Sequence, residues 1–353
     1  MTYRLRDDIS AEVATHLRLR RPTHLSHWTS ATPVPALHYS QFVRVLRLST
    51  ALVVILLAVT TPSVTAQRAV PYSRDLQGTW SNGTITPLER PDDLKDQAYL
   101  SPTAAAEYER TWLANFRKNF TEEDLMAPDL DYTFMDRQSV VPSRRTSLIT
   151  DPPDGRLPPL LPAAKARADA RPKASRDDPE VMGLAERCLM ETSFGSSVSA
   201  PPLVPSPFGQ NYYQIVQTPT HVMIYSEVVH DARIVRIGGR HLPPSVQLWL
   251  GDSIGRWEGE TLVVDTTNFS ERTHFRSSGP HLHVVERFRR TSETTIDYTF
   301  TVDDPETWAR PWSAEVPFRA VDDRMYEYAC HEANYSMTNV LRGARAEEQN
   351  SER

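Results

Sequence analysis

The stretch TTIDYTFTV, residues 294–302, alternates hydrophobic and polar side chains without interruption. Successive side chains of an extended strand point to opposite faces, so this alternation gathers the hydrophobic residues on one face. The hydrophobic set comprises Ile296, Tyr298, Phe300 and Val302. Threonines and Asp297 occupy the other face. The stretch therefore predicts a strand of an antiparallel sheet that is buried on one side and faces water on the other.

Short runs of strand-forming residues surround this stretch, and Gly or Pro turn signals separate them. The other expected strands are 212–218, 221–229, 232–237, 246–250, 256–258, 261–267, 281–290, 313–320 and 324–330. Such spacing is typical of an antiparallel barrel or sandwich, so we expect a mainly β fold. Residues 75–80, DLQGTW, resemble the Gly-x-Trp element at the first strand of lipocalin-type barrels, which makes a lipocalin-like meander one form of this fold.

One or two helices are expected beside the sheet. Ser101 and Pro102 match the capping and first positions of a helix, and aromatic residues follow at four-residue spacing. These are Tyr108, Trp112, Phe116 and Phe120, which we expect to pack against the core. Residues 141–207 are dense in proline, which favours extended and turn backbone, so we expect a long wrap around the sheet.

The segment 43–67, VRVLRLSTALVVILLAVTTPSVTAQ, has the features of a cleavable signal peptide. Two arginines precede the apolar run 51–59, and Val64-Thr65-Ala66 supplies small residues at the cleavage site. A membrane-spanning helix needs about 20 apolar residues, so the run is too short to be an anchor. The alternative is a buried core helix. We expect a signal peptide at 43–66 and a periplasmic or secreted protein of bacterial type.

The signal peptide divides the chain. Residues 1–42 are expected to lie upstream of the true translation start, with Val43 or Val45 as the initiator. Residues 67–353 then form a single soluble β-rich domain. Within it, residues 75–210 supply the helix and the Pro-rich segment, and residues 211–340 supply the main sheet.

The net charge of −6 and the absence of a Lys/Arg block in the mature part disfavour a nucleic-acid partner, because phosphate binding needs clustered cations. We also expect no integral membrane span. The chain has two cysteines, Cys188 and Cys330, which form a natural disulfide pair in an oxidising compartment. The bond would join the segment before the sheet to the expected last strand, and an entropic model assigns such a loop about 4 to 5 kcal/mol. Two buried thiols are the alternative.

Four sequence blocks resemble a large family of exported bacterial proteins that usually carry no functional description. They are RTSLITDPPDGRLPPL (145–160), QIVQTPTHVMIYSE (214–227), GRWEGETLVVDTTNF (255–269) and YEYACHEANY (326–335). The resemblance covers roughly residues 75–348. It implies export and a single domain, and it implies no activity, cofactor or catalytic residue.

Candidate catalytic residues come from carboxylates that share a strand face with hydrophobic side chains, since the sequence lacks H-E-x-x-H and C-x-x-C motifs. Glu286, Glu227 and Asp265 show this pattern. Burial raises the pKa of an inward carboxyl group, which suits acid–base work. The alternative is that Arg233, Arg236 or Arg287 neutralises each one in a structural ion pair.

Histidines supply the second candidate group. His281 and His283 are two residues apart on an expected strand, so both imidazoles would face one side and could bind a metal. His331 and Glu332 follow the expected last strand and are further catalytic candidates. We expect them at the mouth of the sheet, close to Glu286 or Glu227 and to one of the paired histidines. No cofactor is expected, with a divalent metal as the alternative.

Aromatic and amide side chains near the expected strand ends suggest a small-molecule partner. The candidates for ligand contact are Trp249, Trp257, Tyr326, Tyr328 and Asn334. The first hypothesis is therefore a β-domain that binds a small apolar or glycosidic ligand. The alternatives are a hydrolase, lyase or isomerase with His/carboxylate chemistry, or an interaction module of the cell envelope. An enzyme requires a histidine and a carboxylate within hydrogen-bond reach, whereas a binder does not.

Overall fold

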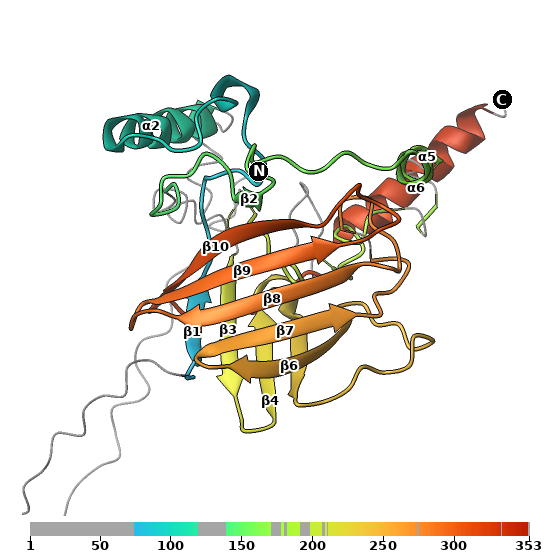
Figure 1. Ribbon diagram of the computed structural model, residues 1–353. Helices are drawn as coiled ribbons and strands as arrows, with labels where there is room; N and C mark the ends of the chain where they lie inside the picture. The colour runs from blue at the N-terminus through green and yellow to red at the C-terminus, as the bar shows by residue number, and fades with distance from the viewer. Residues whose placement is uncertain are drawn as a thin grey trace, which may run out of the picture. The chain divides into compact units, whose positions relative to one another are not determined.

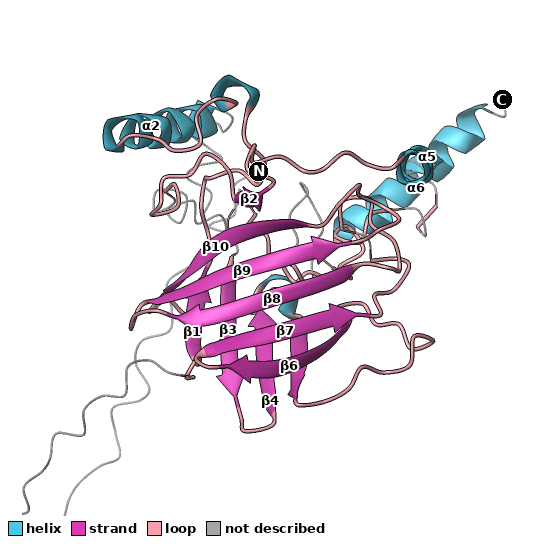
Figure 2. Ribbon diagram, viewed as in Figure 1, coloured by secondary structure: helices cyan, strands magenta, loops and turns pink. Residues whose placement is uncertain are grey.

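The structure, a computed structural model, describes residues 74–118, 139–170, 178–179, 182–190, 198–206, 209, 211–273, 275–332 and 334–351. The expected signal peptide at 43–66 and the expected upstream segment 1–42 lie outside these residues, as does Phe120. In the described part, the chain forms a mainly β domain with three α-helices (Figures 1 and 2).

Nine strands close into a barrel, which confirms the predicted fold class. The strands are β1 (Gly78–Ser81), β3 (Tyr212–Gln217), β4 (His221–Ser226), β5 (Ala232–Ile237), β6 (Asp252–Glu258), β7 (Thr261–Thr267), β8 (His283–Arg290), β9 (Thr295–Asp303) and β10 (Trp312–Ala320). Closure occurs at β1, which pairs with β3 on one side and with β10 on the other. The short strand β2 (Ile149–Asp151) pairs with β10 outside this ring. Figure 1 shows β7 to β10 crossing in front of β1, β3 and β4.

One pairing departs from the expected antiparallel arrangement. β5 and β6 run parallel, with Val235 opposite Ser253 and Ile237 opposite Gly255. The long connection 238–251 makes this possible, because parallel neighbours require the chain to return to the same end of the sheet before it pairs. This connection contains the expected strand 246–250, which is wrong: those residues form turns and one isolated bridge.

The interior of the barrel is an aromatic core. The predicted alternation in β9 is confirmed, since its four hydrophobic side chains are fully buried. Rings from different strands contact one another across the interior: Tyr298 lies 5.2 Å from Phe318 between ring centroids, and Phe288 lies 4.7 Å from Tyr298. Trp80 of the Gly-Thr-Trp element is also buried, with the Arg290 guanidinium 5.2 Å from the centre of its ring. Aromatic burial of this extent supplies much of the stabilisation of a β-barrel.

The Pro-rich segment contacts the barrel through its described parts. Leu203 is buried in the same core, and its backbone N–H donates a hydrogen bond to the Tyr298 hydroxyl inside the barrel (2.9 Å). Its carbonyl accepts from the Asn82 side chain (3.1 Å). This part of the wrap therefore packs on the interior side chains at one end of the barrel.

The three helices are α2 (Pro102–Lys118), α5 (Pro162–Ala170) and α6 (Tyr335–Ser351); single 3-10 turns occur at Asp92–Leu94 and Val228–His230. The predicted start of α2 is confirmed, because the Ser101 hydroxyl accepts a hydrogen bond from the Ala104 N–H (3.1 Å). Tyr108 and Trp112 pack on a small separate cluster around Ile85. The sequence reasoning predicted no helix at α6.

The expected last strand, 324–330, is also wrong: those residues form no strand. The neighbours that it would need are already taken, because β10 pairs with β9, β1 and β2. The segment is instead held by the Tyr326 backbone N–H, which donates to the Glu227 carboxylate (2.7 Å).

Candidate functional site

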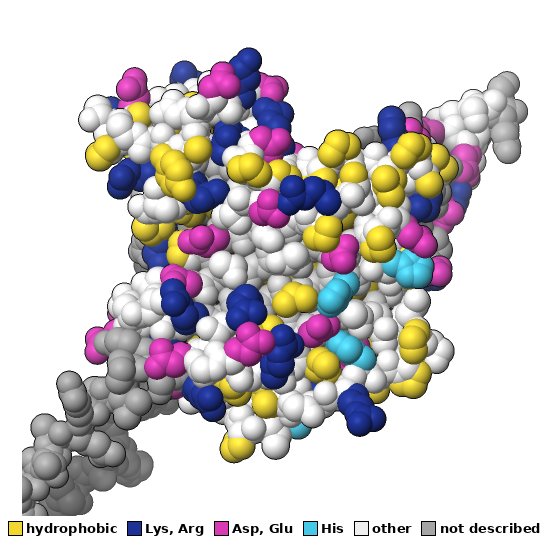
Figure 3. Space-filling model, viewed as in Figure 1, with side chains coloured by type: hydrophobic (Ala, Val, Ile, Leu, Met, Phe, Trp, Pro, Cys, Tyr) yellow, Lys and Arg dark blue, Asp and Glu magenta, His cyan; other side chains and the backbone are white. Residues whose placement is uncertain are grey.

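A chain of hydrogen-bonded charged side chains lies on the outer face of the barrel. The Nε2 atom of His283 on β8 is 3.0 Å from Oδ1 of Asp265 on β7. Register explains the contact: Asp265 is opposite Val285, so His283 is its diagonal neighbour on the same face. Figure 3 shows an acidic side chain between two histidine side chains on this face.

The outward position of Asp265 corrects the expectation of an inward carboxylate. The inward residues of β7 are Leu262 and Val264, which belong to the barrel core. Val263 shares the face of Asp265 but is buried for another reason: it lies between Arg256 and Arg287 on the neighbouring strands. The aliphatic stems of such arginines can cover an apolar side chain on an otherwise wet surface.

A second histidine approaches Asp265 from the β5–β6 connection. His241 Nε2 lies 3.1 Å from the same atom, Asp265 Oδ1, and His241 Nδ1 lies 3.0 Å from Asp252 Oδ2. Asp252 is 2% exposed, and it also accepts from the Leu242 backbone N–H (2.8 Å) and pairs with Arg236 (3.0 Å). The hydrogen-bonded side chains therefore follow one another in the order Arg236, Asp252, His241, Asp265 and His283.

The connection that carries His241 is fixed to the end of β7 by Asn268. The Asn268 side-chain amide donates to the carbonyls of Leu242 (2.9 Å) and Pro243 (3.3 Å). Its own carbonyl accepts from the Leu248 N–H (2.9 Å). Asn268 has φ 56°, a left-handed conformation that asparagine tolerates better than most residues. Asn268, three residues after Asp265, thus holds both the start and the end of the connection.

The contact between Asp265 and His283 favours the charged form of each side chain. The hydrogen bond from His283 is the largest cause that lowers the pKa of Asp265, and burial opposes it. The hydrogen bond with Asp265 raises the pKa of His283, against burial, with Asp303 adding a smaller attraction. Both side chains remain accessible, Asp265 at 27% and His283 at 38% exposure. Within the described residues, His283 forms a hydrogen bond through only one of its two ring nitrogens.

Glu286 forms a structural ion pair with Arg233, as the alternative interpretation of the sequence predicted. It is fully buried inside the barrel and bonded to both terminal nitrogens of Arg233, one at 2.9 Å. The Tyr298 hydroxyl donates to the same carboxylate (2.9 Å). Arg233 is buried as well, so each charge is compensated by its partner rather than by water.

The remaining catalytic candidates lie elsewhere. Glu227 is half-buried, and burial raises the pKa of its carboxyl group while the Tyr326 N–H lowers it. His331 and Glu332 are exposed, in the turn before α6. Among the described residues, neither side chain forms a hydrogen bond or ion pair, and their grouping with Glu286 or Glu227 stays a prediction.

The two paired histidines have separate partners. His281 precedes β8 and lies 3.4 Å from Glu306, whereas His283 binds Asp265. In the described part of the chain, no group of three or more His, Cys, Asp or Glu side chains has the geometry to hold a metal ion. The two-histidine metal site therefore stays a prediction without a third ligand in these segments.

The five candidates for ligand contact fall in different environments. Trp249 is exposed on the β5–β6 connection, and Tyr326 is exposed beside Glu227. Trp257 packs against the barrel core, and Tyr328 packs on Val198 and the 3-10 turn Val228–His230. Asn334 caps α6, because its oxygen accepts from the Met337 N–H (3.2 Å). Trp249 is the member of this set that lies on the segment carrying His241.

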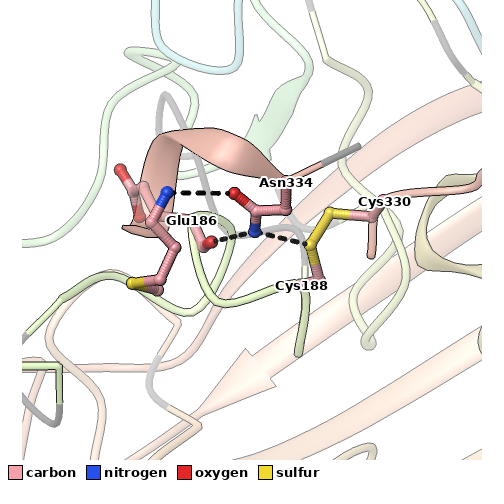
Figure 4. The surroundings of a disulfide bond; sticks show 5 residues. Glu186, Cys188, Cys330 and Asn334 are labelled. Atoms are coloured by element: carbon pink, nitrogen blue, oxygen red, sulfur yellow. Dashed lines mark hydrogen bonds between the residues drawn. A yellow bond between two sulfur atoms is a disulfide. The ribbon is translucent and has the colours of Figure 1, made fainter. Parts of the chain in front are cut away.

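The predicted disulfide is confirmed. Cys188 and Cys330 are bonded, with a Cα–Cα distance of 5.8 Å (Figure 4). The Asn334 side-chain nitrogen donates to the Glu186 carbonyl (3.0 Å) and contacts the Cys188 sulfur (3.3 Å). The bond therefore attaches the turn around Cys188 to the start of α6, and not to a final strand as expected.

Sequence reasoning missed His241 and Asp252. Neither lies in a strand that the sequence predicted, and the carboxylate of Asp252 meets His241 only because the β5–β6 connection folds back. Asp252 belongs to the pentapeptide GDSIG (251–255), which has the spacing of a nucleophile elbow. Its Ser253 is buried within β6 with its hydroxyl on Thr266 (2.9 Å), so this serine is not exposed on a strand-to-helix turn.

Comparison with known proteins adds no further assignment: no family model, no curated protein and no solved structure matches this chain. In the described segments, no helix is both long enough and apolar enough to cross a membrane.

Proposed function

We propose that the protein is an acid–base enzyme, a hydrolase, lyase or isomerase. In this proposal His283 transfers the proton, and Asp265 orients the His283 ring. The observation that carries the proposal is the His283–Asp265 hydrogen bond of 3.0 Å on an accessible surface. A histidine held at one ring nitrogen by a carboxylate presents its other nitrogen in a fixed direction, which is the arrangement that general bases use.

The chemistry follows from the two side chains. Neutral His283 takes a proton at Nδ1 from water or from a substrate C–H or O–H bond, and the ring becomes an imidazolium. Asp265 stabilises that positive charge through Nε2–H, and His283 returns the proton to the leaving group or product. Because Asp265 raises the pKa of His283 above 6.5, base catalysis should increase with pH through the neutral range.

A panel of nitrophenyl esters, nitrophenyl glycosides and lactones, assayed with the chain from Gln67 onward, tests this proposal. His283→Gln should reduce kcat/KM about 10²-fold or more, the usual contribution of a general base. His281→Gln is the matched control, because His281 is two residues away and pairs with Glu306 on the surface. Turnover that is unchanged in His283→Gln, or reduced equally by both substitutions, would contradict the proposal.

Binding of a small apolar or glycosidic ligand is the second candidate function. It is supported by three exposed hydrophobic side chains, Val246, Leu248 and Trp249, on the connection that carries His241. Figure 3 shows hydrophobic side chains beside the histidines on this face. Aromatic glycosides should quench the fluorescence of Trp249, and Trp249→Phe should remove the change. The control is Ile234→Ala, an exposed hydrophobic residue on β5. Quenching that persists in Trp249→Phe would contradict this second function.

We also propose that the protein is exported and belongs to the family of exported proteins that its sequence blocks resemble. The signal-like segment 43–66 and the Cys188–Cys330 bond support export, since disulfides persist in oxidising compartments. N-terminal sequencing of the protein from its host should give a mature start at Gln67. A mature protein that retains residues 1–41 would contradict export by this signal.

A further inference from the structure

The two histidines of the outer-face site use one oxygen atom. Both His241 Nε2 and His283 Nε2 lie within hydrogen-bond distance of Asp265 Oδ1, at 3.1 Å and 3.0 Å. We infer that His241, held in place by Asp252, competes with His283 for Asp265 Oδ1 and thereby limits how strongly Asp265 holds a proton on His283. The inference rests on the proposed function in one respect, the role of His283 as the base.

Asp252 is well placed to hold His241. Its carboxylate is almost inaccessible to water, and three groups donate to it or pair with it: His241 Nδ1, the Leu242 N–H and Arg236. Arg236 in turn donates to the carbonyl of Arg240, the residue before His241 (2.8 Å). The orientation of the His241 ring is thus set at one nitrogen by a buried carboxylate, which directs the other nitrogen at Asp265.

The backbone around the site is also closely packed. Gly251 has φ +70°, and a Cβ built on it would lie 2.6 Å from the Thr266 side chain and 2.9 Å from the Phe269 ring. The turn before Asp252 therefore rests directly on the end of β7. This contact and the Asn268 hydrogen bonds hold the connection that carries His241 in place beside Asp265.

Competition for one acceptor has a chemical consequence. Carboxylates flank both nitrogens of the His241 ring, so Nδ1 and Nε2 both donate only in the form of the ring that carries a proton on each. In that form Asp265 Oδ1 already accepts from a second donor, and it stabilises the His283 imidazolium less than an oxygen that serves it alone. Among the described residues, the charged groups that act on the two rings are Asp252, Asp265 and Asp303, and Arg236 pairs with Asp252. A base works best when its pKa is close to the working pH, so His241 would keep His283 available in its neutral form.

Two substitutions at position 241 separate the hydrogen bonds of the ring. The amide nitrogen of asparagine falls near the place of Nδ1, so His241→Asn keeps the contact with Asp252 and withdraws from Asp265. The amide nitrogen of glutamine falls near Nε2, so His241→Gln keeps a donor to Asp265. His241 is a partly exposed loop residue, and both variants should fold.

The measurement is an NMR titration of the imidazole signals in the resting protein, with His283 assigned through His283→Gln. His241→Asn should raise the pKa of His283 by about half a unit or more, and His241→Gln should raise it less. A mere loss of structure would displace Asp265 and lower the pKa of His283 instead. An unchanged or lower value in His241→Asn, or equal rises in both variants, would overturn the competition.

Asp252→Asn tests the holding role. Loss of its negative charge lowers the pKa of a nearby histidine directly, so a rise at His283 can come only through a released His241. A fall or no change would overturn the role of Asp252. These titrations need no substrate, so they decide the inference even if His283→Gln shows that the chain is not an acid–base enzyme.

Discussion

Two carboxylates on neighbouring strands illustrate how side-chain direction determines chemistry. Asp265 on β7 lies opposite Val285, and Glu286 on β8 lies opposite Val264, so the two carboxylates point to opposite faces of one wall. Glu286 enters the aromatic interior and is neutralised by Arg233. Asp265 faces outward, where it binds two histidines and remains accessible to water. Only the second environment leaves a proton carrier within reach of a substrate.

The outer pair predicts a defined pH dependence of stability. The pKa of His283 is raised from 6.5, so its contribution is complete below 6.5 and is lost as the pH rises through the folded-state pKa. The pKa of Asp265 is lowered from 3.8, so its contribution is present above 3.8 and is lost as the pH falls through the folded-state pKa. Asp265→Asn should therefore lower the free energy of unfolding by about 1 kcal/mol or less, mainly between pH 4 and 6.5.

Urea unfolding of the wild type and Asp265→Asn at pH 5 and pH 8.5 checks this prediction. The gap between the two proteins should shrink at the higher pH as His283 loses its proton. A gap that grows from pH 5 to pH 8.5 would show that the ion pair is not its origin.

The inner pair predicts a much larger effect. Glu286→Gln leaves the buried guanidinium of Arg233 without its counter-charge, so the free energy of unfolding should fall by about 3–5 kcal/mol. Replacing both residues, as Arg233→Met with Glu286→Leu, should cost less than the single change because no charge is left buried. The surface pair Arg289–Asp297 supplies the control: Asp297→Asn should change stability by about 0.5 kcal/mol or less. Equal losses in the single and double variants, measured by urea unfolding, would contradict this account.

At the level of elements, the barrel wall has two short pairings, β1 with β10 and β5 with β6, and the parallel β5–β6 pairing is the one packed around a glycine. It joins three residues on each strand, whereas the antiparallel pairs on either side are longer. The side chains of Val235 and Ile237 fill the space above Gly255, where a Cβ would lie 2.8 Å from a methyl group of each. A methyl group at this position would therefore force the side chains of Val235 and Ile237 to shift.

Gly255→Ala should lower the free energy of unfolding by about 1–3 kcal/mol, as overpacking of a core does. Gly279→Ala is the matched control, because a Cβ there would meet nothing within 4 Å. Chemical unfolding measures both. Equal stability of Gly255→Ala and the wild type would mean that the β5–β6 seam opens easily enough to absorb the methyl group.

On the scale of the whole molecule, the disulfide joins parts of the chain 142 residues apart. A cross-link over so long a loop restricts the unfolded chain strongly, and loss of such bonds typically costs 2–5 kcal/mol. Cys188→Ser with Cys330→Ser should lower the urea midpoint accordingly, and reduction of the wild type should lower it by a similar amount. Identical midpoints in oxidised and reduced wild-type protein would show that the bond adds no stability.

Local sequence signals predicted most strands of the barrel wall and the start of α2. Alternation in 294–302 and the Ser101-Pro102 pair are local signals, and local side-chain direction and capping do not depend on distant residues. The same reasoning paired the cysteines, because the chain has only two. It also identified Asp265 and His283 as candidate site residues, since each stands on a strand with a clear pattern.

The three-dimensional fold decided which expected strands found a partner and which distant residues met. The run 324–330 has the composition of a strand but forms none, because β10 is already paired with β9, β1 and β2. Val263 looks like a core residue but is buried on the outer face between Arg256 and Arg287, and Asp265 shares that outer face. His241 and Asp252 came together through the fold of the 238–251 connection. Contacts of this kind depend on how the chain folds in three dimensions, so the alternation of hydrophobic and polar residues along the sequence does not predict them.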